Sequence, residues 1–314
     1  MKRKRRIWRY FFLILLIPFG CLLVLQYAQA GINVQILNSF SDEIQEWENK
    51  GYELDEVVIT DLMCLQEEYI ISIFSPIETD ILAGKPYYGI LKIYVVQEDE
   101  IAPFFEKEFD YRLFNLEVRD IDGDYNNEII VEWSGGGTSW MVNGIAIFEM
   151  RNGCMVPVKV IPPIASFSED SSLIPSAYLA DLDGDRVCEL LVVDTTFENT
   201  YLSARGIKAW RVFSLENGYY QENCSSFPFF YEKEIDELKK ELVLEPTAPI
   251  SLVFAMSLYL NYYYKGEAKE GFKEFTKFIF NKEFMESWEA ERKLRKSLEP
   301  LSDIVEDLLS KYPL

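Results

Sequence analysis

Residues 118–131 read VRDIDGDYNNEIIV, and residues 179–192 read LADLDGDRVCELLV. Both stretches are a loop of the form D-x-D-G-D-x-x-x-E that runs directly into an aliphatic strand. Carboxylates at loop positions 1, 3, 5 and 9 can converge on one point, and such hard oxygen ligands suit Ca²⁺. The two stretches therefore predict calcium binding, at one site at least.

The two loops belong to a longer repeat of about 60 residues, whose third and degenerate copy begins at Asp61 and keeps only the first acid. Each first Asp is followed, about 24 to 28 residues later, by a Gly-Ile pair that opens an alternating strand. These pairs are Gly89-Ile90, Gly144-Ile145 and Gly206-Ile207. The last two of these strands run into Asn152-Gly153 and Asn217-Gly218, which are typical of tight hairpin turns. The pattern predicts three copies of a small antiparallel unit.

These features resemble the FG-GAP and VCBS-type repeats, which form the blades of calcium-bearing β-propellers. The resemblance covers residues 50–230, approximately. By likeness, one ligand set consists of Asp120, Asp122, Asp124 and Glu128, and the other of Asp181, Asp183, Asp185 and Glu189. The resemblance implies a mainly β repeat domain with propeller-like antiparallel blades over residues 31–230.

Two features depart from that family. Position 6 of its calcium loop is usually Gly, because the backbone turns sharply there, whereas this chain has Tyr125 and Arg186. Closed propellers have about four to eight blades, and only three copies are visible. The alternative interpretation of both loops is a pair of metal-free Asx turns that cap hairpins. Four like charges packed together without a cation are electrostatically unfavourable, which favours metal.

The N-terminus predicts export. A basic segment precedes an apolar run at residues 11–25, and Ala28-Gln29-Ala30 then suits signal peptidase. We expect residues 1–30 to be a signal peptide that is cut before Gly31. The alternative is an uncleaved signal anchor, which is the only form that would place the protein in a membrane. In both cases the residues from 31 onward lie outside the cytoplasm.

Charge and residue usage exclude several classes of function. The chain has a net charge of −21, and residues 1–30 hold six basic and no acidic side chains, so cleavage would leave −21 − 6 = −27. Such acidity disfavours nucleic acid and anionic membrane surfaces as partners. The sequence contains no histidine, which argues against zinc sites and Ser-His-Asp triads. Export permits disulfides among Cys64, Cys154, Cys188 and Cys224 without fixing their pairing.

The sequence pattern changes to helical after the repeats, which predicts a small all-α domain over residues 231–314. Residues 252–280 weakly resemble a tetratricopeptide helix pair. The matching packing positions are Leu258, Tyr262, Gly266, Gly271, Phe275 and Phe278. The other interpretation of this segment is an ordinary helical hairpin.

The favoured function is an exported calcium-binding protein that acts as a non-enzymatic binding or scaffold module at the cell surface. Its partner would be an extracellular protein or a glycan. One alternative is a carboxylate-dependent enzyme acting on glycans, for which Trp133 and Trp140 could stack on sugar rings. The other alternative is a structural envelope protein whose acidic turns hold no metal.

Overall fold

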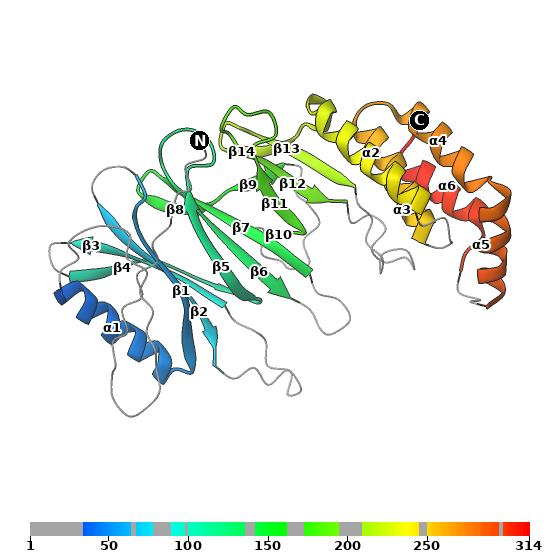
Figure 1. The fold of residues 1–314 in the computed structure, drawn as a ribbon. Coiled ribbons are helices and arrows are strands. Elements are labelled where there is room, and N and C mark those ends of the chain that lie inside the picture. The colour runs from blue at the N-terminus through cyan, green and yellow to red at the C-terminus, as the bar shows by residue number, and fades with distance from the viewer. Residues whose placement is uncertain are drawn as a thin grey trace, which may run out of the picture. The chain divides into compact units, whose positions relative to one another are not determined.

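The computed structural model describes most of the chain after residue 33 (Figure 1). The described ranges are residues 34–63, 67–77, 89–97, 100–135, 142–161, 173–194, 209–244, 250–294 and 298–314. The predicted signal peptide, Cys64, Trp140 and the Gly206-Ile207 pair lie outside these ranges. Among the described helices, none is long and apolar enough to cross a membrane.

The chain is divided into two compact units, residues 1–158 and residues 159–314. Antiparallel sheets make up most of the first unit, and the second unit combines a further sheet with the C-terminal helices. A β-rich chain with a helical C-terminal region was predicted and is confirmed at that level. The predicted boundary at residues 230 and 231 lies inside the second unit, close to the change from strand to helix.

The first unit contains one helix and two antiparallel meanders. Helix α1 is Val34–Asn49. The first meander consists of β1 (Tyr52–Asp61), β2 (Glu68–Pro76), β3 (Gly89–Gln97) and β4 (Glu100–Phe109). The second consists of β5 (Arg112–Arg119), β6 (Glu128–Gly135), β7 (Val142–Arg151) and β8 (Cys154–Pro157). Within each meander, every strand pairs antiparallel with the next one along the chain.

Helix α1 covers one face of the first meander, although its residues fall within the segment predicted as β repeats. Its buried side chains recur at helical spacing and meet alternate residues of β2 and β3. The contacting set is Ile36, Phe40, Ile44 and Trp47 from the helix, with Ile70, Phe74, Ile90 and Tyr94 from the strands. The Glu43 carboxylate accepts from Lys92 Nζ and from Tyr94 Oη, both at 2.7 Å, so the helix is also attached by polar contacts.

The second meander packs against the first within this unit. Phe148 of β7 lies against Phe105 and Phe109 of β4, with ring centroids 5.7 and 6.2 Å apart. Gly89 opens β3 because a side chain cannot fit there: an added Cβ would lie 2.5 Å from Leu113 Cγ. Its N–H donates to the Tyr111 carbonyl at 3.0 Å. The Gly of the predicted Gly-Ile strand start therefore serves close packing.

The second unit contains a third meander. Its strands are β11 (Ala177–Ala180), β12 (Glu189–Val193), β13 (Trp210–Glu216) and β14 (Tyr219–Glu222), all antiparallel in sequence order. The short strand β9 (Lys159–Ile161) adds to β14 in parallel, and β10 is Ile174–Pro175. The turns at Asn152-Gly153 and Asn217-Gly218 have positive φ at both residues, as the predicted tight hairpins require.

Helices follow the third meander in the second unit. They are the 3₁₀ helix η3 (Cys224–Ser226) and α2 (Pro228–Leu244), α3 (Ile250–Tyr264), α4 (Ala268–Ile279), α5 (Lys282–Leu294) and α6 (Leu301–Lys311). Gly266 ends α3 with φ +88°, and Gly271 allows α3 and α4 to approach, because a Cβ there would lie 2.4 Å from Tyr262 Cβ.

One hydrophobic core joins the third meander to these helices. Ala209 and Val212 are buried together with Tyr231 and Ile235 of α2. The Tyr231 hydroxyl donates to the Trp210 carbonyl at 2.9 Å, which ties α2 to β13. The third meander is therefore continuous in packing with the helices that follow it.

We expect Tyr231→Ala to lower the free energy of unfolding by about 3 to 5 kcal/mol, because it empties a fully buried aromatic position in the shared core. Urea unfolding should be monitored with two probes, circular dichroism and the hydrogen exchange of β13. Both probes should show one common transition for strands and helices. The control is Phe229→Ala on the same helix, whose side chain is 83% exposed and should change stability by about 0.5 kcal/mol or less. Separate transitions for β13 and α2 would contradict the shared core.

Candidate metal centre

Strand register places the three repeat loops at the same point of each meander. The first Asp of each loop lies at or directly after the end of a first strand, β1, β5 or β11. The residue at loop position 9 then pairs with the residue before that Asp: Tyr69 with Thr60, Glu128 with Arg119, and Glu189 with Ala180. The sequence alignment of the repeat thus agrees with the register of the sheets.

Asp120 organises the first acid loop through backbone N–H groups. Its Oδ1 accepts from Gly123 N at 2.7 Å and from Asp122 N at 3.2 Å, and its Oδ2 accepts from Tyr125 N at 3.0 Å. Glu128 closes the loop, since its Oε2 accepts from Ile121 N at 2.9 Å. Short polar side chains that bind nearby N–H groups in this way favour a turn over a continued strand.

The second acid loop repeats these contacts. Asp181 accepts from Gly184 N at 2.7 Å and from Arg186 N at 3.2 Å. Glu189 Oε2 accepts from Leu182 N at 2.9 Å. The two loops therefore share one hydrogen-bonded framework, set by the same spacing of acids.

Position 6 of both loops adopts the left-handed conformation that usually requires Gly. Tyr125 has φ +71° and Arg186 has φ +78°. Such a conformation costs a non-Gly residue about 1 to 2 kcal/mol, and the hydrogen bond from each of these N–H groups to the first Asp helps to offset it. The departure from the family's Gly thus leaves the backbone turn in place.

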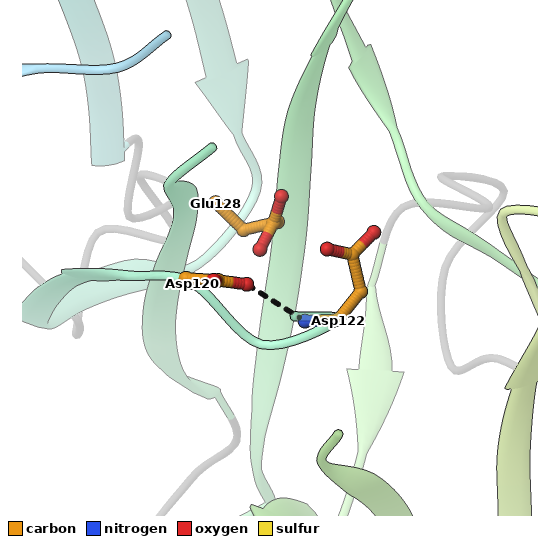
Figure 2. Close-up of side chains that lie close together, drawn as sticks. All are labelled: Asp120, Asp122 and Glu128. Carbon is orange, nitrogen blue, oxygen red and sulfur yellow. Dashed lines mark hydrogen bonds between the residues drawn. The ribbon is translucent and has the colours of Figure 1, made fainter. Parts of the chain in front are cut away.

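Each loop brings three carboxylates together. One oxygen each from Asp120, Asp122 and Glu128 lies within 4.8 Å of the others (Figure 2). The corresponding oxygens of the second loop, from Asp181, Asp183 and Glu189, meet the same limit.

The fourth acid of each predicted set lies outside these groups. Asp124 Oδ1 accepts from Asn126 N at 2.7 Å, and Asp185 Oδ1 accepts from Val187 N at 2.7 Å. The structure thus assembles positions 1, 3 and 9 of each loop, while position 5 caps the backbone that follows.

Burial and like charge raise the pKa values within the first group. Glu128 is 4% exposed, and burial together with the charges of Asp122, Asp124 and Asp120 raises its pKa to about 8, against a lowering contribution from the Ile121 N–H. Burial also raises the pKa of Asp122. Burial is the largest cause of the raised pKa of Glu128, and a bound cation would favour the ionised carboxylate by offsetting the neighbouring negative charges.

The second group is more exposed than the first. Asp181 and Asp183 are exposed, whereas Asp120 and Asp122 are half-buried. Burial raises the pKa of Glu189, with Asp183 and Asp185 adding to the effect. Charges at the second loop are therefore better screened by water, and the first loop is the stronger candidate for binding a cation.

The chain matches no family model and no curated protein. The resemblance to calcium-bearing repeats therefore depends on the residues of this sequence alone.

The aromatic residues and cysteines that the sequence singled out lie in different environments. Trp133 is 1% exposed and its ring packs against Tyr111 at 4.7 Å, so it cannot offer a ring face to a sugar, and Trp140 lies outside the described residues. Cys154 is exposed, whereas Cys188 and Cys224 are buried.

The sequence indicated no role for Asn127, which precedes Glu128 and contacts the first meander. The only signal in the sequence was that its side chain is an amide, which can donate hydrogen bonds.

Without divalent cations, stability should fall as pH rises from about 4.5 to about 8, because Glu128 keeps its proton over this range only in the folded state. The largest slope for one such group is about 1.4 kcal/mol per pH unit. Glu128→Gln should reduce the slope, measured by urea unfolding in chelator between pH 5 and pH 8. Glu117→Gln on β5, whose side chain is half exposed, is the control. Equal slopes in Glu128→Gln and wild type would contradict the assigned pKa.

Proposed function

We propose that this chain is an exported protein whose two acid loops bind Ca²⁺ and whose meanders act as a binding or scaffold module at the cell surface. The observation that carries the proposal is the recurrence of one loop geometry in two meanders, each with three carboxylate oxygens within 4.8 Å. A single acidic turn would have favoured a metal-free cap, whereas a repeated one at matching register favours a ligand.

The donor set suits calcium among the common cations. All candidate ligands are carboxylates, and Ca²⁺ prefers several hard oxygen ligands in a flexible arrangement. Asp120, Asp122 and Glu128 would hold one ion, with Asp124 as the further acid of that set. The second ion would be held by Asp181, Asp183 and Glu189, together with Asp185. The ion would supply positive charge that lets each loop keep its carboxylates ionised and close together.

The three meanders are blade-like units in this proposal. Each has four antiparallel strands in sequence order, and the first strand is connected to the second by an acid loop in the second and third meanders and by the degenerate loop in the first. Helix α1 covers one face of the first meander, and α2 shares a core with the third. Because α1 covers one face of the first meander, the likeness to a propeller in this proposal concerns the single blade rather than a closed ring.

Export and acidity support a surface role. The basic and apolar N-terminal segment favours export, and the acidity of the remainder disfavours nucleic acid and anionic lipid as partners. An extracellular protein or a glycan is the proposed partner. Extracellular calcium modules typically bind the ion weakly, with dissociation constants of about 10⁻⁴ to 10⁻³ M.

A thermal melt tests the calcium proposal. For dissociation constants of about 10⁻⁴ to 10⁻³ M, about 1 mM free Ca²⁺ should add roughly 0.4 to 1.4 kcal/mol per site. We expect chelation to lower Tm by a few degrees, Asp122→Asn to remove most of the calcium response, and Asp183→Asn to remove less. Glu117→Gln removes one charge outside the acid loop and should keep the full response. If chelation and Asp122→Asn both leave the melt unchanged, the loops are metal-free turns.

A further inference from the structure

Asn127 links the first acid loop to the degenerate loop of the first meander. Its backbone N–H donates to the Leu62 carbonyl at 2.8 Å, and its side-chain Nδ2 donates to the Asp61 carbonyl at 3.0 Å. These bonds join residues more than sixty positions apart in the chain. Leu62 is fully buried, so its carbonyl belongs to a packed part of the first meander.

The degenerate loop has no carboxylate at three of the four ligand positions of the repeat. Loop positions 3, 5 and 9 are Met63, Leu65 and Tyr69. The acid at its position 1, Asp61, accepts from Met63 N at 3.0 Å and so shapes the turn that presents the two carbonyls to Asn127. The turn after β1 therefore holds the neighbouring acid loop through two backbone carbonyls.

We propose that Asn127 couples the acid loop of the second meander to β1 and β2 of the first, so that a cation bound by the loop also restricts those strands. The inference rests on the proposed calcium binding. Asn127 directly precedes Glu128, which closes the group of carboxylates, so the two hydrogen bonds of Asn127 and the group share one short piece of backbone. A ligand that fixes one end of this piece reduces the opening of the other.

The second acid loop has no side-chain amide at the corresponding position. Its position 8 is Cys188, and the Cys188 carbonyl accepts from Tyr220 Oη within the third meander at 3.0 Å. The coupling is thus a property of the first loop, and Asn127 is a positioning residue rather than an ion ligand.

Hydrogen exchange of the purified protein, with about 1 mM Ca²⁺ or with chelator, tests the coupling. In the wild type we expect calcium to slow exchange about 2- to 10-fold in residues 120–128 and also in β1 and β2, the range that follows from the typical affinity. If calcium slowed exchange in residues 120–128 but not in β1 and β2, the coupling would be overturned and the proposed calcium binding would be supported. No slowing in either segment would overturn the coupling and the proposed calcium binding together.

Two variants test the route. Asn127→Ala removes the bond to Asp61 and should reduce the calcium-dependent slowing in β1 and β2 while the loop stays protected. Asn126→Ala is the matched control, because Asn126 Nδ2 donates to Asp124 at 2.8 Å inside the same loop. In this variant, calcium should still slow exchange in β1 and β2. If Asn127 had only a structural role, Asn127→Ala would speed exchange in β1 and β2 by the same factor with calcium and with chelator. That result would overturn the proposal. Asn127→Ser replaces Asn127→Ala if the latter does not fold.

Discussion

Like-charge repulsion inside the acid loops is the constraint on which the structure of the repeats depends. Backbone N–H groups hold the first acid of each loop, and the closing Glu is buried at the start of the next strand. Three carboxylates placed this closely repel one another when they are ionised, and a bound cation would offset this repulsion. Burial, with the neighbouring negative charges adding to it, raises the pKa of Glu128, and calcium is the cation that we propose for the group.

The same loops also connect parts of the fold. In the first unit, the loop after β5 binds the turn after β1 through Asn127, and aromatic contacts pack the two meanders together. A charge group at this junction can therefore influence two sheets. In the second unit, the corresponding loop follows β11, in a sheet that shares its core with α2.

Local signals allowed much of the repeat to be predicted from sequence. The acid loops and the Asn-Gly turns depend on residues that lie within a few positions of each other, and both adopt the expected backbone. Helix α1 was missed within the predicted β segment, although Ile36, Phe40, Ile44 and Trp47 recur at helical spacing.

Long-range contacts could not be predicted. The core shared by Val212 and Tyr231, and the bonds from Asn127 to the first meander, join segments whose approach depends on the whole fold. The left-handed conformation of Tyr125 and Arg186 at position 6, with its hydrogen bond to the first Asp, was likewise not indicated by the sequence. Exclusion of Asp124 from the assembled carboxylates likewise depends on atomic positions within the loop.

The most direct measurement is the number of calcium ions bound per chain, obtained by equilibrium dialysis of the purified protein against increasing free Ca²⁺. Our account predicts saturation at two ions in the wild type, and at one ion in Asp122→Asn and in Asp183→Asn. Binding of no ion by the folded wild-type chain at millimolar calcium would contradict it.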